Sequence, residues 1–160
     1  MLRAALASTL LLTPVVAASS PVDDLLAAAA RTCAGIDGGE MTAPEGAVTS
    51  VDLSGDGAAD AVVDESRLTC STAASAFCGS GGCMVHAVVG NKVTSWLATG
   101  WRIIDWNQDR ILLIGRDGGD CGGIGAERCY EAAVWSDGRF LTVAPPDTTP
   151  PDTAPPDTTE

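Results

Sequence analysis

The sequence is short of positive charge, histidine and aromatic rings. Nine Lys and Arg residues stand against 21 Asp and Glu, which gives a formal net charge of −12 over 160 residues. Nucleic acid and anionic membrane surfaces attract clustered Lys and Arg, so this composition excludes both as expected partners. His86 is the single histidine, and aromatic residues make up 4% of the chain. The usual acid–base group is therefore scarce.

A long hydrophobic run is also missing, although the chain begins with a short one. Residues 1–18 carry Arg3 near their start, continue through an apolar run from Ala4 to Val16, and end in small residues. This run is shorter than the roughly 20 residues of a membrane span. The pattern is typical of a secretory signal peptide, so we expect export to the periplasm or the medium, with no membrane insertion of the mature chain.

The segment 145–160 is a repeat that offers almost nothing to bury. Three copies of a Pro-Pro-Asp-Thr unit, from Pro145 to Thr159, precede Glu160. Proline-rich acidic repeats favour an extended, solvated chain, so we predict a disordered tail. Residues 19–144 are then the single folded domain, and 46% hydrophobic residues in the whole chain suffice for a core.

Within 19–144, one helical segment precedes a series of short β-like runs. Ser20, Pro21, Asp23 and Asp24 form a helix start, and the helix is expected to stop near Gly35. Gly90-Asn91 and Asp137-Gly138 are hairpin-turn dipeptides. We predict an α+β domain, with one N-terminal helix packed on a mostly antiparallel β-sheet. The expected strands are Ala47–Leu53, Ala61–Asp64, Val85–Val89, Val93–Ala98, Trp101–Asp105, Arg110–Ile114, Glu131–Ser136 and Arg139–Val143.

Six cysteines in an exported chain indicate disulfides, because their spacing differs from that of zinc knuckles. Six cysteines allow 15 pairings, so spacing alone does not decide among them. Two pairs bracket glycine-rich turns and look like local links, which leaves one pair to join the helix to the strands. We therefore favour the pairs Cys33–Cys70, Cys78–Cys83 and Cys121–Cys129.

One loop carries the residue pattern of a cation site. Between residues 52 and 60, oxygen side chains occur at loop positions 1, 3, 5 and 9, and Gly57 occupies position 6. Ca²⁺ prefers such oxygen ligands, and position 7 can add a backbone carbonyl. Val63 at position 12 excludes an EF-hand. We expect a structural Ca²⁺ site; the alternative is a hairpin turn whose acids face water. The candidate ligands are Asp52, Ser54, Asp56, Ala58 and Asp60.

This loop resembles the calcium loops of integrin-type FG-GAP and VCBS-repeat proteins. The likeness covers about a dozen residues and implies a cation held between two strands, with Asp52, Ser54, Asp56 and Asp60 as side-chain ligands. Ser54 stands where those loops usually have Asn or Asp. Residues 30–143 also resemble a group of small exported bacterial proteins, through Ala76–Cys83 and Gly100–Trp106. That resemblance implies a compact exported domain and transfers no catalytic residue.

Other candidate functional groups are weaker. His86, with Ser80 nearby in sequence, is the only basis for a small hydrolase. Asp117 and Asp120 flank two glycines, which fits a common turn, a second cation loop or a carboxylate pair for acid–base chemistry. Trp96, Trp101 and Trp106 form either part of the core or a ligand surface.

The sequence thus favours a disulfide-held binding or envelope-maintenance domain without catalysis. Its partner would be an envelope protein or a glycan. An inhibitor or carbohydrate-binding module that uses exposed Trp is the first alternative, and a hydrolase that uses His86 is the second.

Overall fold

The computed structural model describes residues 19–107 and 109–143, so the predicted signal peptide and the predicted tail lie outside the described residues. It contains one α-helix, α1 (Pro21–Ala34), and eleven strands in the described ranges. The strands are β1 (Met41–Thr42), β2 (Val48–Val51), β3 (Asp60–Asp64), β4 (Thr69–Cys70), β5 (Cys78–Gly79), β6 (Gly82–Val89), β7 (Lys92–Ala98), β8 (Gly100–Trp106), β9 (Asp109–Arg116), β10 (Cys129–Ser136) and β11 (Arg139–Val143). Two short 3-10 helices, η1 (Glu65–Arg67) and η2 (Gly118–Cys121), lie between strands.

The helix begins where the sequence predicts. The Ser20 hydroxyl accepts a hydrogen bond from the Asp23 N–H, and the Asp23 carboxylate accepts one from the Ser20 N–H, which completes a capping box. Pro21 occupies the first turn, where a missing N–H costs nothing. Leu26 and Ala29 of α1 pack with Leu68 in a small apolar cluster.

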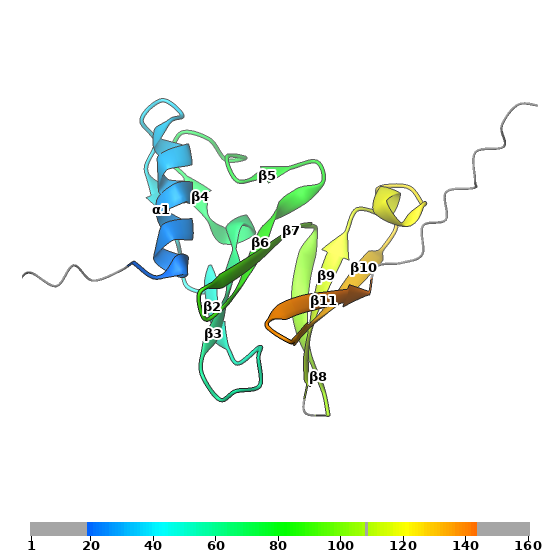
Figure 1. Cartoon of the computed structure of the whole chain (residues 1–160). Coiled ribbons are helices and arrows are strands. Elements are labelled where there is room, and N and C mark those ends of the chain that lie inside the picture. Colours follow the sequence, from blue (N-terminus) through cyan, green and yellow to red (C-terminus); the bar gives the residue numbers. More distant parts are fainter. Residues whose placement is uncertain (1–18, 108, 144–160) are drawn as a thin grey trace, which may run out of the picture.

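All strand pairs in the described residues are antiparallel, and they form two main sheets. The first sheet has the order β2-β3-β6, with β5 and β7 also paired to β6; the second has the order β11-β10-β9-β8. A separate two-stranded ladder joins β1 to β4. Figure 1 shows α1 on one side of the first sheet and the second sheet on the other. The predicted α+β class, with one helix and antiparallel strands, is confirmed, and the strands divide into two sheets.

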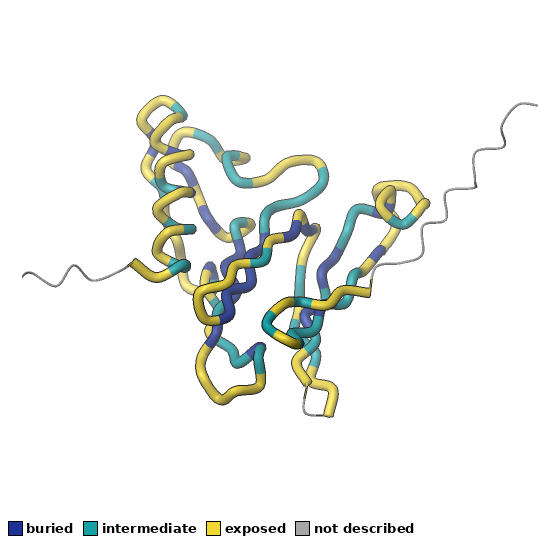
Figure 2. The backbone as a smooth tube through the Cα atoms, in the orientation of Figure 1, coloured by how far each residue is buried: buried dark blue, intermediate teal, exposed yellow. Residues whose placement is uncertain are grey.

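The main core lies between the two sheets. Alternation along β3, β6 and β9 places one set of side chains on the inner faces, and these form the buried band of Figure 2. The fully buried members are Val62, Ala87, Leu112, Ile114 and Ala133. Both sheets contribute to this core, so each covers the apolar inner face of the other.

Three disulfides link these parts, with the pairing that the sequence analysis favours. Cys33 in α1 joins Cys70 in β4, across 37 residues. Cys78–Cys83 closes the β5–β6 turn, where Gly82 has φ +115° and a Cβ would collide with the Ala98 carbonyl. Cys121–Cys129 joins η2 to β10. None of the helices in the described ranges has the length and apolar content of a membrane span.

Candidate functional site

The loop between β2 and β3 is organised by its own carboxylates. Asp60 is 7% exposed, and its Oδ2 accepts hydrogen bonds from the N–H groups of Leu53 (2.9 Å) and Ser54 (3.0 Å). Asp56 Oδ1 accepts from the Ala58 N–H at 2.7 Å. The loop is therefore a turn that is stabilised by hydrogen bonds from its backbone N–H groups to its own carboxylates.

Asp52 closes the other side of this loop. Its Oδ1 accepts from the Gly55 N–H (2.7 Å) and its Oδ2 from the Gly57 N–H (3.0 Å). Desolvation raises the pKa of the Asp52 carboxyl, but these backbone bonds and the Ser54 hydroxyl outweigh it, so the net pKa is lowered. At neutral pH Asp52 is ionised.

These residues match calcium in kind, since Asp52, Asp56 and Asp60 all offer carboxylate oxygens. Gly55 (φ +76°) and Gly57 (φ +84°) adopt the left-handed conformations that allow a loop to wrap an ion. In the described part of the chain, however, no three Asp, Glu, His or Cys side chains are grouped as a metal site. Hydrogen bonds within the loop account for its conformation, and the Ca²⁺ ligands stay a prediction.

A larger feature is an open cleft of about 490 Å³ between the sheets. One wall comes from the β2–β3 side, through Thr49, Asp64 and Arg67, and the other comes from Trp101 of β8. Arg102, the next residue on this edge strand, faces the other side of the second sheet and borders the cleft at its rim. The register explains this meeting, because Thr49 faces Val62 and Asp64 faces Val85, so both lie on the inner face of the first sheet.

Asp64 is the buried polar link across the cleft. It is 6% exposed, and its Oδ2 accepts a hydrogen bond from Trp101 Nε1 at 2.9 Å. Its Oδ1 caps η1 by accepting from the Ser66 N–H at 2.9 Å. The link fixes the Trp101 indole against the opposite sheet, so a wall of the cleft is held in place before any ligand arrives.

The two arginines that line the cleft make fewer polar contacts than Asp64 does. Arg67 Nε lies 3.7 Å from Asp64 Oδ2, and 58% of the Arg67 side chain is exposed. Arg102 is exposed, and within the described residues its side chain has no hydrogen-bond or ion-pair partner. Arg102 also lines a second hollow of about 200 Å³, next to Tyr130. Cationic groups therefore remain available at the cleft.

Sequence reasoning missed part of this cleft. The position of Asp64, directly after Val62-Val63, suggests a surface acid beyond the cation loop, whereas the structure buries it. The alternation of side chains along a strand could have indicated this burial, because it places residues 60, 62 and 64 on one face of β3. Val62 on that face is fully buried. Arg67 carries no sequence signal of its own, because its place depends on how the two sheets meet.

The tryptophans do not form one surface. Trp96 is 7% exposed and packs edge-on against Phe140, with ring centroids 5.3 Å apart, so of the two alternatives it belongs to the core and not to a ligand surface. Trp101 and Trp106 are five residues apart on β8 and therefore point to opposite faces. Trp101 lines the cleft, and Trp106 is 62% exposed away from it.

His86 connects three elements. Its Nδ1 lies 2.7 Å from Ser95 Oγ of β7, and its Nε2 lies 3.1 Å from Glu65 Oε1 of η1. These are the residue types of an acyl-transfer triad, with Ser95 in the place that the sequence suggests for Ser80. None of the three lines the cleft at Trp101. His86 thus acts as a buried tie between η1, β6 and β7.

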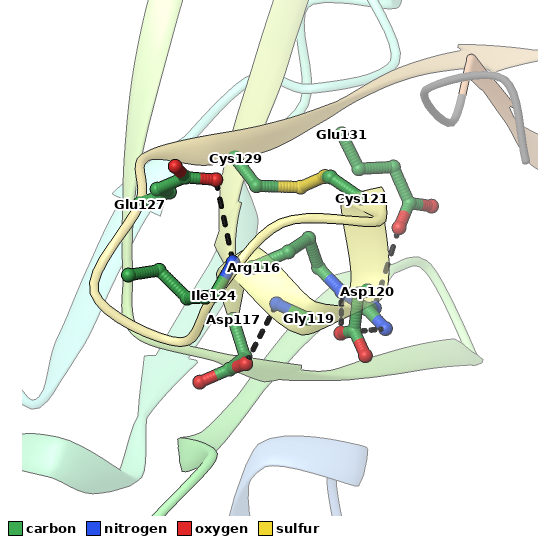
Figure 3. The surroundings of a disulfide bond; sticks show 9 residues. All are labelled: Arg116, Asp117, Gly119, Asp120, Cys121, Ile124, Glu127, Cys129 and Glu131. Carbon is green, nitrogen blue, oxygen red and sulfur yellow. Dashed lines mark hydrogen bonds and ion pairs between the residues drawn. A yellow bond between two sulfur atoms is a disulfide. The ribbon is translucent and has the colours of Figure 1, made fainter. Parts of the chain in front are cut away.

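The acids near Cys121 serve local structure. Asp117 Oδ1 accepts from the Gly119 N–H at 2.9 Å and caps η2. Asp120 pairs with Arg116 at 3.0 Å, and Arg116 also lies 3.3 Å from Glu131 (Figure 3). These contacts hold the η2 turn onto β9 and β10 beside the Cys121–Cys129 bond, which supports the turn over a second cation loop.

Comparisons of this chain with protein-family models, with curated proteins and with solved structures found no match. The structure by itself defines a small disulfide-rich α+β domain, and its three disulfides fit an oxidising compartment.

Proposed function

We propose that this is an exported, non-catalytic binding domain that holds an anionic ligand in the cleft between its sheets. The observation that carries this proposal is the placement of Arg67 beside Trp101, with Arg102 at the rim of the same cleft, in a chain with a net charge of −12. Concave sites that combine an aromatic wall with a few polar groups are the usual form of small-ligand sites.

The charge balance of the cleft favours an anion. Its one acid, Asp64, already accepts hydrogen bonds on both carboxylate oxygens, whereas Arg102 is unpaired among the described residues. Guanidinium groups suit carboxylates, which they can bind through two parallel hydrogen bonds. The Trp101 indole offers an apolar surface beside these donors. A sugar acid combines both features, in agreement with a glycan as partner.

Titration calorimetry on the oxidised chain tests this with two sugars of equal length. Trigalacturonate carries carboxylates and maltotriose carries none. We expect trigalacturonate to bind and maltotriose to bind at least tenfold more weakly. Arg102→Gln should weaken trigalacturonate binding about tenfold, since a hydrogen bond to a charged group contributes about 1.5–3 kcal/mol.

Arg31→Gln is the matched control, because Arg31 is exposed in the last turn of α1 and its loss changes the net charge equally. It should leave trigalacturonate binding unchanged. Equal binding of both sugars would contradict the anionic ligand and leave a neutral carbohydrate module. Heat from neither sugar would contradict a sugar ligand at this cleft.

The second part of the proposal is a structural Ca²⁺ ion at residues 52–60. It is supported by the three loop carboxylates and by the two left-handed glycines, Gly55 and Gly57. Three carboxylates in one short loop repel one another, and a divalent cation would relieve that repulsion. The ion would fix the β2–β3 turn, on the chain segment that leads from one wall residue of the cleft, Thr49, to another, Asp64.

Thermal unfolding with and without millimolar Ca²⁺ tests the ion. At free Ca²⁺ near 100 times Kd, mass action adds about 2.7 kcal/mol, which raises Tm by several degrees. Asp56→Ala should abolish the rise, because it removes one of the three carboxylates that would bind the ion. Asp56 is an exposed loop residue, so its loss leaves the core intact. Mg²⁺ at the same concentration is the control for ionic strength. The same Tm with Ca²⁺ and with Mg²⁺ would leave the loop as a hydrogen-bonded turn.

A further inference from the structure

The second sheet has an apolar face on the side away from the first sheet. Cross-strand pairing defines two rows of residues that share this side. The first row runs across the four strands as Arg102, Leu113, Ala132 and Val143, and the second as Ile104, Ile111, Val134 and Leu141. We call these eight positions the outer face. Seven of the eight are apolar.

The sequence of β9 already carries this feature. Ile111-Leu112-Leu113-Ile114 is an unbroken apolar run, and Leu112 and Ile114 belong to the core between the sheets. An antiparallel strand with one solvated face alternates apolar and polar residues, whereas an unbroken run is typical of a strand covered on both faces. The outer face therefore has the composition of a buried surface.

The structure nevertheless leaves the outer face accessible. Leu141 is 45% exposed and Val143 is 75% exposed, and the remaining apolar members are only half-buried. The first sheet differs, because α1 lies on its corresponding side (Figure 1). The largest apolar patch of a soluble protein often serves as an interaction surface.

The rest of the sequence supplies no apolar segment suited to this face. Residues 144–160, which follow Val143 directly, consist of Pro, Asp, Thr, Ala and a final Glu. Residues 1–18 are apolar but are predicted to be removed on export. Neither of these two segments is suited to cover the outer face.

A second copy of this chain meets the charge requirement. None of the chain's 21 acids occupies the eight positions of the outer face, and Asp109, paired with Trp106 in the next row, is the one acid on the same side of the four paired strands, so two such faces can approach with few carboxylates against each other. A flat apolar face is also self-complementary, as a two-fold interface requires. Two sheets packed in this way lie about 10 Å apart, the usual spacing of a β-sandwich.

We propose that the outer face is the contact between two copies of this chain. Four strands spaced about 4.8 Å apart, with two rows of same-side residues about 6.8 Å apart, give a footprint of roughly 260 Å² per copy, and roughly 390 Å² if a third row takes part. A stable interface buries about 800 Å² per partner, so this contact belongs to the weak class. The dimer forms at micromolar or higher protein concentrations and is stronger at high salt, which screens the repulsion between two acidic chains.

Sedimentation velocity on the oxidised chain, from about 5 µM to 1 mM, tests the proposal. We expect the weight-average mass to rise towards that of a dimer, and the dissociation constant to fall at least threefold between 50 and 500 mM NaCl. The double variant Leu141→Lys with Val143→Lys should weaken the dimer at least tenfold. Both side chains are already exposed on an edge strand, so the fold should tolerate the change.

The matched control is Val93→Lys with Leu97→Lys on β7, which also carries exposed apolar side chains, at 42% and 48%. This variant should dimerise as the parent does. A chain that stays monomeric up to 1 mM would overturn the proposal. So would a dimer that the β7 variant abolishes and the β11 variant preserves, because its contact would then lie on the first sheet.

Discussion

Asp52 shows how one side chain can set the pH dependence of a loop. Three donors around it favour the ionised form: the Gly57 N–H, the Gly55 N–H and the Ser54 hydroxyl. The folded state therefore has a lowered Asp52 pKa. A lowered pKa contributes stability that is present above the unfolded-state value, near pH 4, and is lost as the pH falls through the folded-state value.

We predict that Asp52→Asn lowers the free energy of unfolding at pH 7 and that the difference from the parent shrinks towards pH 3. Urea unfolding at the two pH values, in the presence of a chelator, measures this. The control is Glu40→Gln, an exposed acid whose side chain makes no hydrogen bond or ion pair within the described residues. A difference between Asp52→Asn and the parent that is as large at pH 3 as at pH 7 would contradict the role of the ionised form.

At this same scale, sequence reasoning identified the residue types better than their partners. The acids of the 52–60 loop and the helix cap at Ser20 could be predicted, because their contacts are local in sequence. The bond from Trp101 to Asp64 spans 37 residues and depends on how two sheets pack. No local pattern encodes such a contact.

At the scale of elements, the structure contains a strand at each of the eight expected positions, and each of these strands overlaps the predicted range. The short strands β1, β4 and β5 were missed. Each has only two residues, too few to show a period-two pattern. The β10–β11 turn forms at Asp137-Gly138, where both residues have positive φ, as the dipeptide predicts.

The Cys33–Cys70 bond is the strongest single link between elements. Loop-closure entropy predicts that a bond across 37 residues stabilises the fold by about 4 kcal/mol, and a bond across five residues by about 2 kcal/mol. We therefore expect Cys33→Ala with Cys70→Ala to cost about twice as much as Cys78→Ala with Cys83→Ala. Urea unfolding of both double variants measures the ratio. A larger loss for the Cys78–Cys83 pair would contradict this account.

At the scale of the whole molecule, the sequence predicted one sheet, whereas the described residues form two main sheets and a separate two-stranded ladder. Composition and turn signals fix the strands, but they do not say at which connection the chain leaves one sheet for the next. The change occurs at Thr99, between β7 and β8, and it sends Trp101 to the opposite wall from Asp64. The cleft therefore depends on how the chain passes from one sheet to the other. Its residues lie in predicted strands or next to them, but the strand pattern does not bring them together.

The central claim is that this cleft binds an anion. The indole N–H signals of the four tryptophans, followed by ¹⁵N NMR on the oxidised chain during a trigalacturonate titration, test it most directly. Trp101→Phe identifies the Trp101 signal. We predict a saturable shift of the Trp101 signal, because its Nε1–H bonds Asp64 in the cleft wall, and no shift of exposed Trp106. A titration that moves Trp106 and leaves Trp101 unchanged would place the ligand elsewhere and contradict the account.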